Sequence, residues 1–201
     1  MQVSAEIRWF WPEEPTAVVD WFHDRTIHRL SPGQEDERID CYLHDANQDE
    51  LGLKVRGNKP GIECKGLVAR TSIGVETGPF AGPLEIWCKW SSTSLKIPAN
   101  QLVCVSKRRA VRKFDTAHGA IEVEFDRRPG TGCNVELTEL TLPNGTRWWS
   151  LGFEAFGSLE SVTQSVVRTA AELSSHSAPA LLNAVQASYP AWLKARFPVE
   201  D

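Results

Sequence analysis

Charged residues spaced two or four apart recur along the first three quarters of the sequence. In residues 4–11, SAEIRWFW, Glu6 and Arg8 alternate with apolar side chains. Because the side chains of a β-strand alternate between its two faces, this segment predicts a strand with an acid and a base on one face. Later segments repeat the pattern with the pairs Lys54 and Arg56, Glu63 and Lys65, Glu85 and Lys89, Lys107 and Arg109, and Glu122 and Glu124, and with the single acids Glu136 and Glu154.

Charges of this kind suit the binding of phosphate groups. Arginine offers a fork of hydrogen-bond donors and lysine a point charge, so a face that carries both can hold a chain of phosphates. Carboxylates in the same cavity can hold Mg²⁺ or Mn²⁺, hard cations that prefer oxygen ligands. Phosphoryl transfer requires these parts together with a positioned water molecule.

Two arrangements of the strands are compatible with this alternation. In the first, the charged faces line the inside of a closed barrel and the apolar faces pack against helices. In the second, the charged faces belong to a sheet with one side in water, and the protein is a structural or interaction domain. The alternation alone does not separate the two arrangements, so both stay open at this point.

The order of the expected elements favours an α+β domain. Residues 1–156 are mainly strands, with one early helix after Pro15 and turn signals such as the Pro-Asn-Gly of residues 143–145. Such short, punctuated strands predict a closed or nearly closed antiparallel β-barrel of about eight strands. Residues 158–197 are helical in composition, with Ser158 as an N-cap and a break at Pro190. We expect these C-terminal helices to pack outside the barrel, in a single domain over residues 1–201.

The composition argues against several classes of protein. The 201 residues carry a formal net charge of −4, which provides no overall basic field for long nucleic acids. The sequence shows no signal-peptide pattern and no apolar run that would span a membrane. The five cysteines have no metal-ligand spacing, which predicts free thiols and a cytoplasmic location. The five histidines lie apart in the sequence and predict no metal site.

The arrangement resembles the CYTH superfamily, the triphosphate tunnel metalloenzymes, over the strand region 1–156. That family is marked by a first strand with Glu-x-Glu-x-Lys, and here Ser4, Glu6 and Arg8 stand at these three positions. Six later segments resemble, in chain order, the family's later strands: RIDCYL, LGLKVRG, GIECKG, VSKRRAVRKF, AIEVEFD and LGFEAFG. The resemblance implies an eight-stranded tunnel with helices outside it and a bound Mg²⁺ or Mn²⁺.

The charge pattern and the resemblance together imply roles for the charged residues of these strands. Glu6 and Arg8 are the expected catalytic residues. The expected substrate-binding residues are Arg38, Lys54, Arg56, Lys65, Lys89, Lys107 and Arg109, and the expected metal ligands are Glu6, Glu122, Glu124, Glu136 and Glu154.

These roles predict a metal-dependent phosphohydrolase that acts on a small phosphorylated molecule. Its substrate would be inorganic triphosphate, a nucleoside triphosphate or thiamine triphosphate, and nothing in the residues singles out adenylyl cyclase activity. The alternative is a tunnel that binds phosphates without turning them over. It rests on two departures from the family pattern, because Ser4 replaces an acid and Glu154 lacks the second acid of its strand.

Overall fold

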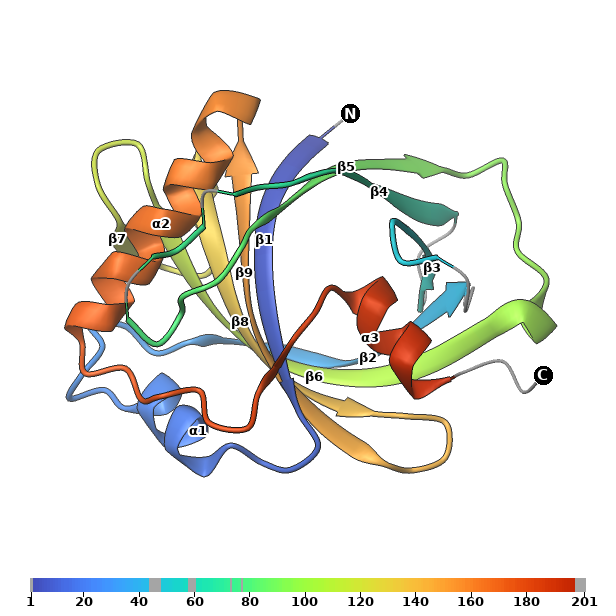
Figure 1. Cartoon of the computed structure of the whole chain (residues 1–201), viewed down its shortest axis with the longest axis horizontal. Helices are drawn as coiled ribbons and strands as arrows, with labels where there is room; N and C mark the ends of the chain where they lie inside the picture. Colours follow the sequence, from blue (N-terminus) through green and yellow to red (C-terminus); the bar gives the residue numbers. More distant parts are fainter. Residues whose placement is uncertain (1, 44–47, 58–60, 73, 77, 198–201) are drawn as a thin grey trace.

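Eight antiparallel strands close into a barrel (Figure 1). The structure, a computed structural model, describes residues 2–43, 48–57, 61–72, 74–76 and 78–197. Within these ranges the barrel strands are β1 (Gln2–Trp11), β2 (Gly33–Leu43), β3 (Leu51–Arg56), β4 (Ile62–Arg70), β5 (Glu85–Ser92), β6 (Leu102–Asp115), β8 (Gly132–Thr141) and β9 (Arg147–Gly157). They follow the order β1-β5-β4-β3-β2-β6-β8-β9, and the pairing of β1 with β9 closes the circuit. The predicted barrel is therefore confirmed.

The remaining elements lie outside this circuit of strands. β7 (Ile121–Val123) pairs with the end of β6, and β10 (Val185–Gln186) pairs with β1. The helices are α1 (Thr16–His23), α2 (Leu159–Ser175) and α3 (Tyr189–Arg196), with a short 3-10 helix, η1 (Ala99–Gln101), before β6. The predicted α+β class is confirmed.

Alternation along β1 separates an apolar outer face from a charged inner face. Ala5, Ile7 and Trp9 are buried in the larger core, which also contains residues of α1 and α2. Glu6 and Arg8 point the other way, into the barrel. The arrangement follows from the period of two in a strand, because the apolar set is buried between the sheet and the elements that cover its outside.

Helix α2 runs along the outside of the barrel, against β1, β8 and β9 (Figure 1). Val162, Val166 and Leu173 recur at the helical period and are fully buried against the strands. Ser158 takes the N-cap position, as predicted. This part of the predicted C-terminal region is confirmed.

The second C-terminal helix is shorter than the composition indicates. Residues 178–188 are not helical and include β10, so that α3 begins only at Tyr189. Pro190 stands in the first turn of α3 instead of breaking a helix, and the Ser188 hydroxyl accepts a hydrogen bond from the backbone N–H of Ala191. Proline suits that position because the first turn leaves its N–H groups without intrahelical partners.

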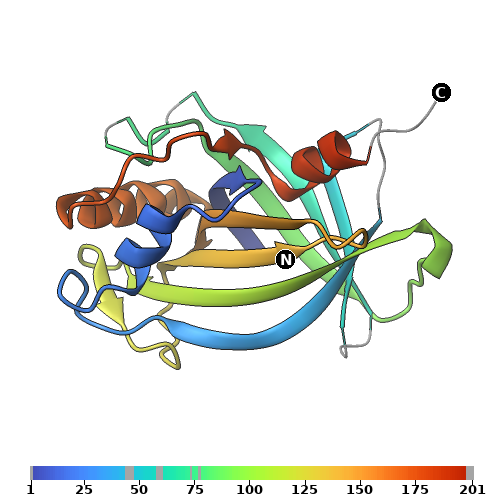
Figure 2. The ribbon, with the colours of Figure 1, turned by 90° about the horizontal axis from the view of Figure 1, so that it is seen from below.

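Helix α3 lies well apart from α2 (Figures 1 and 2). Its buried residues pack against a cluster of apolar side chains from the barrel strands. The Trp192 ring stacks on the Phe10 ring, with 4.7 Å between their centres, and lies edge-on to Trp148. The buried members of this aromatic cluster are Phe10, Tyr42, Val105, Leu140, Leu142, Trp148, Trp192 and Leu193. It therefore fills one part of the barrel interior and leaves the charged residues in the rest.

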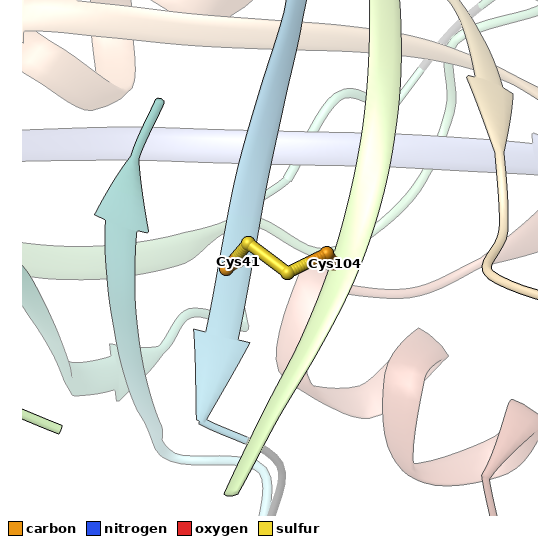
Figure 3. Close-up of a disulfide and its surroundings, with 2 residues drawn as sticks. All are labelled: Cys41 and Cys104. Atoms are coloured by element: carbon orange, nitrogen blue, oxygen red, sulfur yellow. A yellow bond between two sulfur atoms is a disulfide. The ribbon is translucent and has the colours of Figure 1, made fainter. Parts of the chain in front are cut away.

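Two of the five cysteines form a disulfide, Cys41–Cys104, between β2 and β6 (Figure 3). The prediction of free thiols is wrong for this pair, and Cys64, Cys88 and Cys133 are free. The two sulfurs meet because Cys41 and Cys104 are direct cross-strand partners, although 63 residues separate them in sequence. The cysteines therefore no longer support the predicted cytoplasmic location.

In the part of the chain that the structure describes, none of the helices has both the length and the apolar composition needed to cross a bilayer.

Candidate functional site

The charged inner faces of the barrel strands enclose a cavity of about 100 Å³. Eight basic side chains line it: Arg8, Arg38, Lys54, Arg56, Lys65, Lys89, Lys107 and Arg109. Each of these was predicted from the sequence to face a common cavity. The other arrangement, in which these faces meet bulk water on an open sheet, does not hold, because the sheet closes around them.

Three of the predicted acids line the same cavity, and two do not. Glu6, Glu136 and Glu154 are in its wall, together with Glu63. The expectation that Glu122 and Glu124 join them is wrong. Glu122 forms an ion pair with Arg112, and Glu124 is exposed. The reason is the strand order: β7 pairs only with the last residues of β6, whereas β8 pairs with β6 along most of its length and forms the next strand of the barrel wall.

A fully buried carboxylate, Asp40, organises the bases on β2, β3 and β6. Its oxygens lie 3.4 Å from Arg38, 3.5 Å from Lys54, 3.5 Å from Lys107 and 3.9 Å from Arg56. Burial opposes ionisation of Asp40, but these cations outweigh it and lower the pKa to about 2. Asp40 is therefore a fixed negative charge beneath the basic wall.

Lys107 is the most deeply buried of the lysines in the cavity. Its ammonium contacts the Tyr42 hydroxyl and lies 3.7 Å from the centre of the Tyr189 ring. Burial is the main cause that lowers the pKa of Lys107 to about 7, and the neighbouring guanidinium groups of Arg8, Arg38 and Arg109 add to it. The side chain of Lys107 is therefore only partly protonated near neutral pH.

Lys54 is affected in the same direction. Burial, followed by the charges of Lys107 and Arg56, lowers its pKa to about 8, although Asp40 opposes the shift. Several cations packed into one low-dielectric space destabilise one another in this way. An anion placed among them would relieve that repulsion.

The opposite wall of the cavity carries the three acids, each already paired with a base. Glu6 pairs with Lys65, and Glu154 lies 3.9 Å from Lys89. Glu136 is the most buried of the three, and it accepts from Arg109 at 2.7 Å and from Arg8 at 3.3 Å. Burial opposes ionisation of Glu136, yet the charges of Arg109 and Arg8 hold its pKa below the usual range.

The Arg8 guanidinium reaches Glu136 by lying over a glycine. Arg8 and Gly152 are cross-strand partners on β1 and β9, and Gly152 in turn faces Glu136 on β8. A Cβ atom at Gly152 would come 2.4 Å from Arg8 Cζ, so only glycine leaves room for this path. The Tyr189 ring covers Arg8 from another side, at 4.9 Å. The side chain of Arg8 is therefore held in place by its surroundings.

The carboxylates fit a divalent cation only in part. Among the described residues, no group of three or more histidine, cysteine, aspartate or glutamate side chains is placed to hold a metal. Glu6 and Glu154 are nevertheless direct cross-strand partners on the inner face. Mg²⁺ is usually held by one or two carboxylates together with substrate phosphates. This pair therefore offers the type of oxygen ligand that Mg²⁺ and Mn²⁺ prefer.

Two residues that contact the bases of the cavity, Asp40 and Tyr189, were not found by sequence reasoning. Asp40 shares the parity of Arg38 and Tyr42 in residues 38–42, so the alternation of β2 contains the signal that would have placed it. Tyr189 gave no such signal. It comes from the C-terminal helix, and only the fold brings it against β1 and β6.

Comparison with known proteins gives no family assignment. No protein-family model matches the chain, and no curated protein matches its sequence.

Proposed function

We propose that the barrel binds the phosphate chain of a small triphosphate-bearing molecule and hydrolyses it with the help of Mg²⁺ or Mn²⁺. The observation that carries the proposal is the convergence of eight basic side chains from six strands on one enclosed cavity. Only four carboxylates line the same cavity, with Asp40 beneath it, so the wall has an excess of positive charge. A compact polyanion complements that excess better than any other class of small ligand.

Space for a group attached to the phosphates lies next to the cavity, not within it. A second cavity, of about 320 Å³, adjoins it and shares Glu6, Arg8, Ser188 and Tyr189 as lining residues. The phosphate chain would lie among the bases, and an organic group attached to it would extend into the second cavity.

The two walls of the cavity would have different roles in hydrolysis. Lys54, Arg56 and Lys107 would bind phosphate oxygens on one side. On the other side, Glu6 and Glu154 would hold the metal or orient water, and the metal would neutralise charge on the phosphates. Arg8, held over Gly152, would stabilise charge that develops on the transferred phosphoryl group.

Binding without turnover is the second candidate function. A specific observation favours it: Glu6 and Glu154 each contact a lysine, and Ser4 stands beside Glu6 where a further acid would strengthen a metal site. The Ser4 hydroxyl donates to Glu6 at 2.6 Å and supplies no negative charge. In that case the phosphate chain would bind with or without a divalent cation.

Thermal unfolding with candidate ligands tests both functions. Tripolyphosphate, ATP and thiamine triphosphate are added with and without Mg²⁺ or Mn²⁺, and released phosphate is measured in parallel. A ligand at about 100 times its dissociation constant adds about 2.7 kcal/mol to the free energy of unfolding. In a chain of this length that corresponds to a rise in Tm of about 5–11 °C. We expect orthophosphate to stabilise the protein much less than tripolyphosphate.

A matched pair of variants locates the effect. Arg56→Glu should abolish stabilisation by tripolyphosphate, and Lys96→Glu, the same reversal at an exposed loop position, should leave it intact. Lys89→Gln is a milder change at a partly exposed lysine and should weaken the effect without loss of fold. Stabilisation with phosphate release supports the hydrolase, and stabilisation without release supports the binding tunnel. If no polyphosphate stabilises the protein, both functions are refuted.

A further inference from the structure

A third cavity, lined by two histidines, lies outside the barrel, between the segment after α1 and the C-terminal end of α2. It has a volume of about 480 Å³, and two of the five histidines, His28 and His176, are in its wall. The two imidazole rings have their centres 5.8 Å apart. The sequence gives no hint of this pair, because 148 positions separate its members.

Each imidazole has one buried nitrogen without a hydrogen-bond partner. His28 is 2% exposed, and its Nε2 atom is unpartnered. The Nδ1 atom of His176 is likewise buried and unpartnered. A buried polar atom without a partner is costly, and such atoms in native proteins call for an explanation, of which an ion that binds there is one.

An oxygen-bearing group lies near each ring. Hydrogen bonding to the backbone of Trp21 raises the pKa of His28, against the larger lowering by burial. His176 Nε2 lies 3.5 Å from a carboxylate oxygen of Glu172, one turn earlier in α2. Histidines that bind metals show this arrangement, in which one ring nitrogen is fixed by a carbonyl or carboxylate and the other is left for the ion.

Trp21 fixes both histidines at once. Its indole N–H donates to the backbone oxygen of His176 at 2.9 Å, and its ring lies edge-on to that of His28 with 4.9 Å between centres. Trp21 is itself buried in the larger core. The pair is therefore positioned by packed structure and not by exposed loops alone, which favours a preformed site.

We propose that His28 and His176 form a binding site for a divalent transition-metal ion, with Zn²⁺ as the best match. Bonds of ~2.1 Å to nitrogen in an open tetrahedral arrangement place two imidazole centres ~5–6 Å apart, which agrees with the separation of these rings. Neutral imidazole suits zinc, nickel and copper more than the hard cations Mg²⁺ and Mn²⁺.

The charged side chains around the cavity supply no excess of negative charge, so the two imidazole nitrogens would carry the binding of the ion. Arg25 and Arg29 line it together with Glu122 and Glu172, and Glu122 is engaged by Arg112. Burial, followed by the charges of Arg112 and His176, lowers the pKa of His28 to about 4, so its imidazole is neutral at pH 7. With no three-residue metal cluster among the described residues, water would complete the coordination.

Metal titration of the full chain tests the site. The protein is stripped with a chelator, and Zn²⁺ is added in the absence of any phosphate while heat of binding is measured, with Co²⁺ absorbance as a second readout. We expect one ion per chain. His28→Gln and His176→Gln should each weaken binding about tenfold or more, and Glu172→Gln about tenfold, as for other groups that orient a ligand.

Two control variants and a folding check accompany the titration. His118→Gln changes an exposed histidine in a turn, and Glu160→Gln changes an exposed acid at the other end of α2, so both should bind Zn²⁺ like the wild type. Thermal unfolding without metal shows which variants are folded. If His28→Gln does not fold, the test rests on His176→Gln, which changes a partly exposed residue. The proposal is overturned by the absence of saturable binding at one ion per chain, or by equal affinity in His176→Gln and the wild type. Neither result would bear on the phosphate site, since no phosphate is present.

Discussion

Replacing Glu136 by glutamine tests whether the barrel interior is held together by compensated charge. Glu136 is 6% exposed and accepts from Arg8 and Arg109, which come from two other strands. The substitution keeps the size of the side chain and one hydrogen-bond acceptor but removes the negative charge. Arg8, 7% exposed, then remains as a buried cation without its nearest counter-charge.

The expected loss of stability follows from the burial of both partners. Breaking a buried ion pair by removal of one partner costs about 3–5 kcal/mol, because the remaining charge is left uncompensated. The retained acceptor of glutamine favours the lower end, so we expect a loss of about 3 kcal/mol in the free energy of unfolding. For a chain of this length, that corresponds to a fall in Tm of about 6–12 °C.

Urea and thermal unfolding, followed by tryptophan fluorescence and circular dichroism, measure the effect. Glu124→Gln is the matched control, since the same change at an exposed residue should alter stability by less than about 0.5 kcal/mol. Tripolyphosphate should stabilise Glu136→Gln more than the wild type, because the variant lacks an internal anion that competes with the ligand. If Glu136→Gln unfolds like the wild type and gains nothing extra from tripolyphosphate, the interior does not depend on this pairing and the reasoning is refuted.

Three further predictions concern other parts of the cavity and the disulfide. Affinity for tripolyphosphate should fall as the pH rises through about 7, because Lys107 loses its proton there, and Lys107→Arg should show a smaller fall; equal pH profiles in a binding titration would exclude this lysine as the cause. Gly152→Ala should lower the free energy of unfolding by about 1–3 kcal/mol and weaken tripolyphosphate binding, because the new methyl group displaces the guanidinium of Arg8. Gly130→Ala, which adds a methyl group in open space, should change neither quantity in the same unfolding and binding assays. The double variant Cys41→Ala/Cys104→Ala should lose about 2–4 kcal/mol relative to the oxidised protein in urea unfolding, and an unchanged midpoint would show that the crosslink does not constrain the unfolded chain.

Alternation along the strands predicted much of the barrel interior. Each strand has a period of two, so a side chain such as Lys54 or Arg109 is placed on a face by its neighbours in sequence alone. Because the sheet is closed, one set of strand faces points inward, and the predicted bases line one cavity. Prediction from the sequence was successful wherever the position of a residue depended on local backbone geometry and on strand order.

The errors arose where partners distant in sequence decide the structure. Glu122 alternates like a barrel residue, but β7 pairs with only the end of β6 and stays outside the wall. The disulfide depends on the register of β2 against β6, which aligns Cys41 with Cys104. Neither feature has a local pattern, since a register or an edge is set by packing of the whole sheet.

The position of the C-terminal helix had no sequence signal either, and it matters for the site. Residues 189–196 have the composition of any short helix, and nothing in them shows that Tyr189 covers the ammonium of Lys107. The face of the Tyr189 ring and the hydroxyl of Tyr42 contact that ammonium, and the side chain of Lys107 is almost wholly shielded from water. A helix added after the last barrel strand thereby contributes to the low pKa of a lysine on β6.

The internal carboxylates explain how such a basic cavity can be part of a stable fold. Eight cations within one enclosed space would repel one another strongly. Five acids each lie within ion-pair distance of at least one of these cations: Asp40, Glu63, Glu136, Glu6 and Glu154. A phosphate chain must therefore compete with carboxylates that are already in place. A single phosphate can replace few of these contacts, whereas a chain of three presents oxygens along the whole wall and recovers each contact that it disrupts. On the proposed function, the acids that stabilise the cavity would thus favour long, densely charged ligands, which is why we expect tripolyphosphate to raise the Tm much more than orthophosphate does.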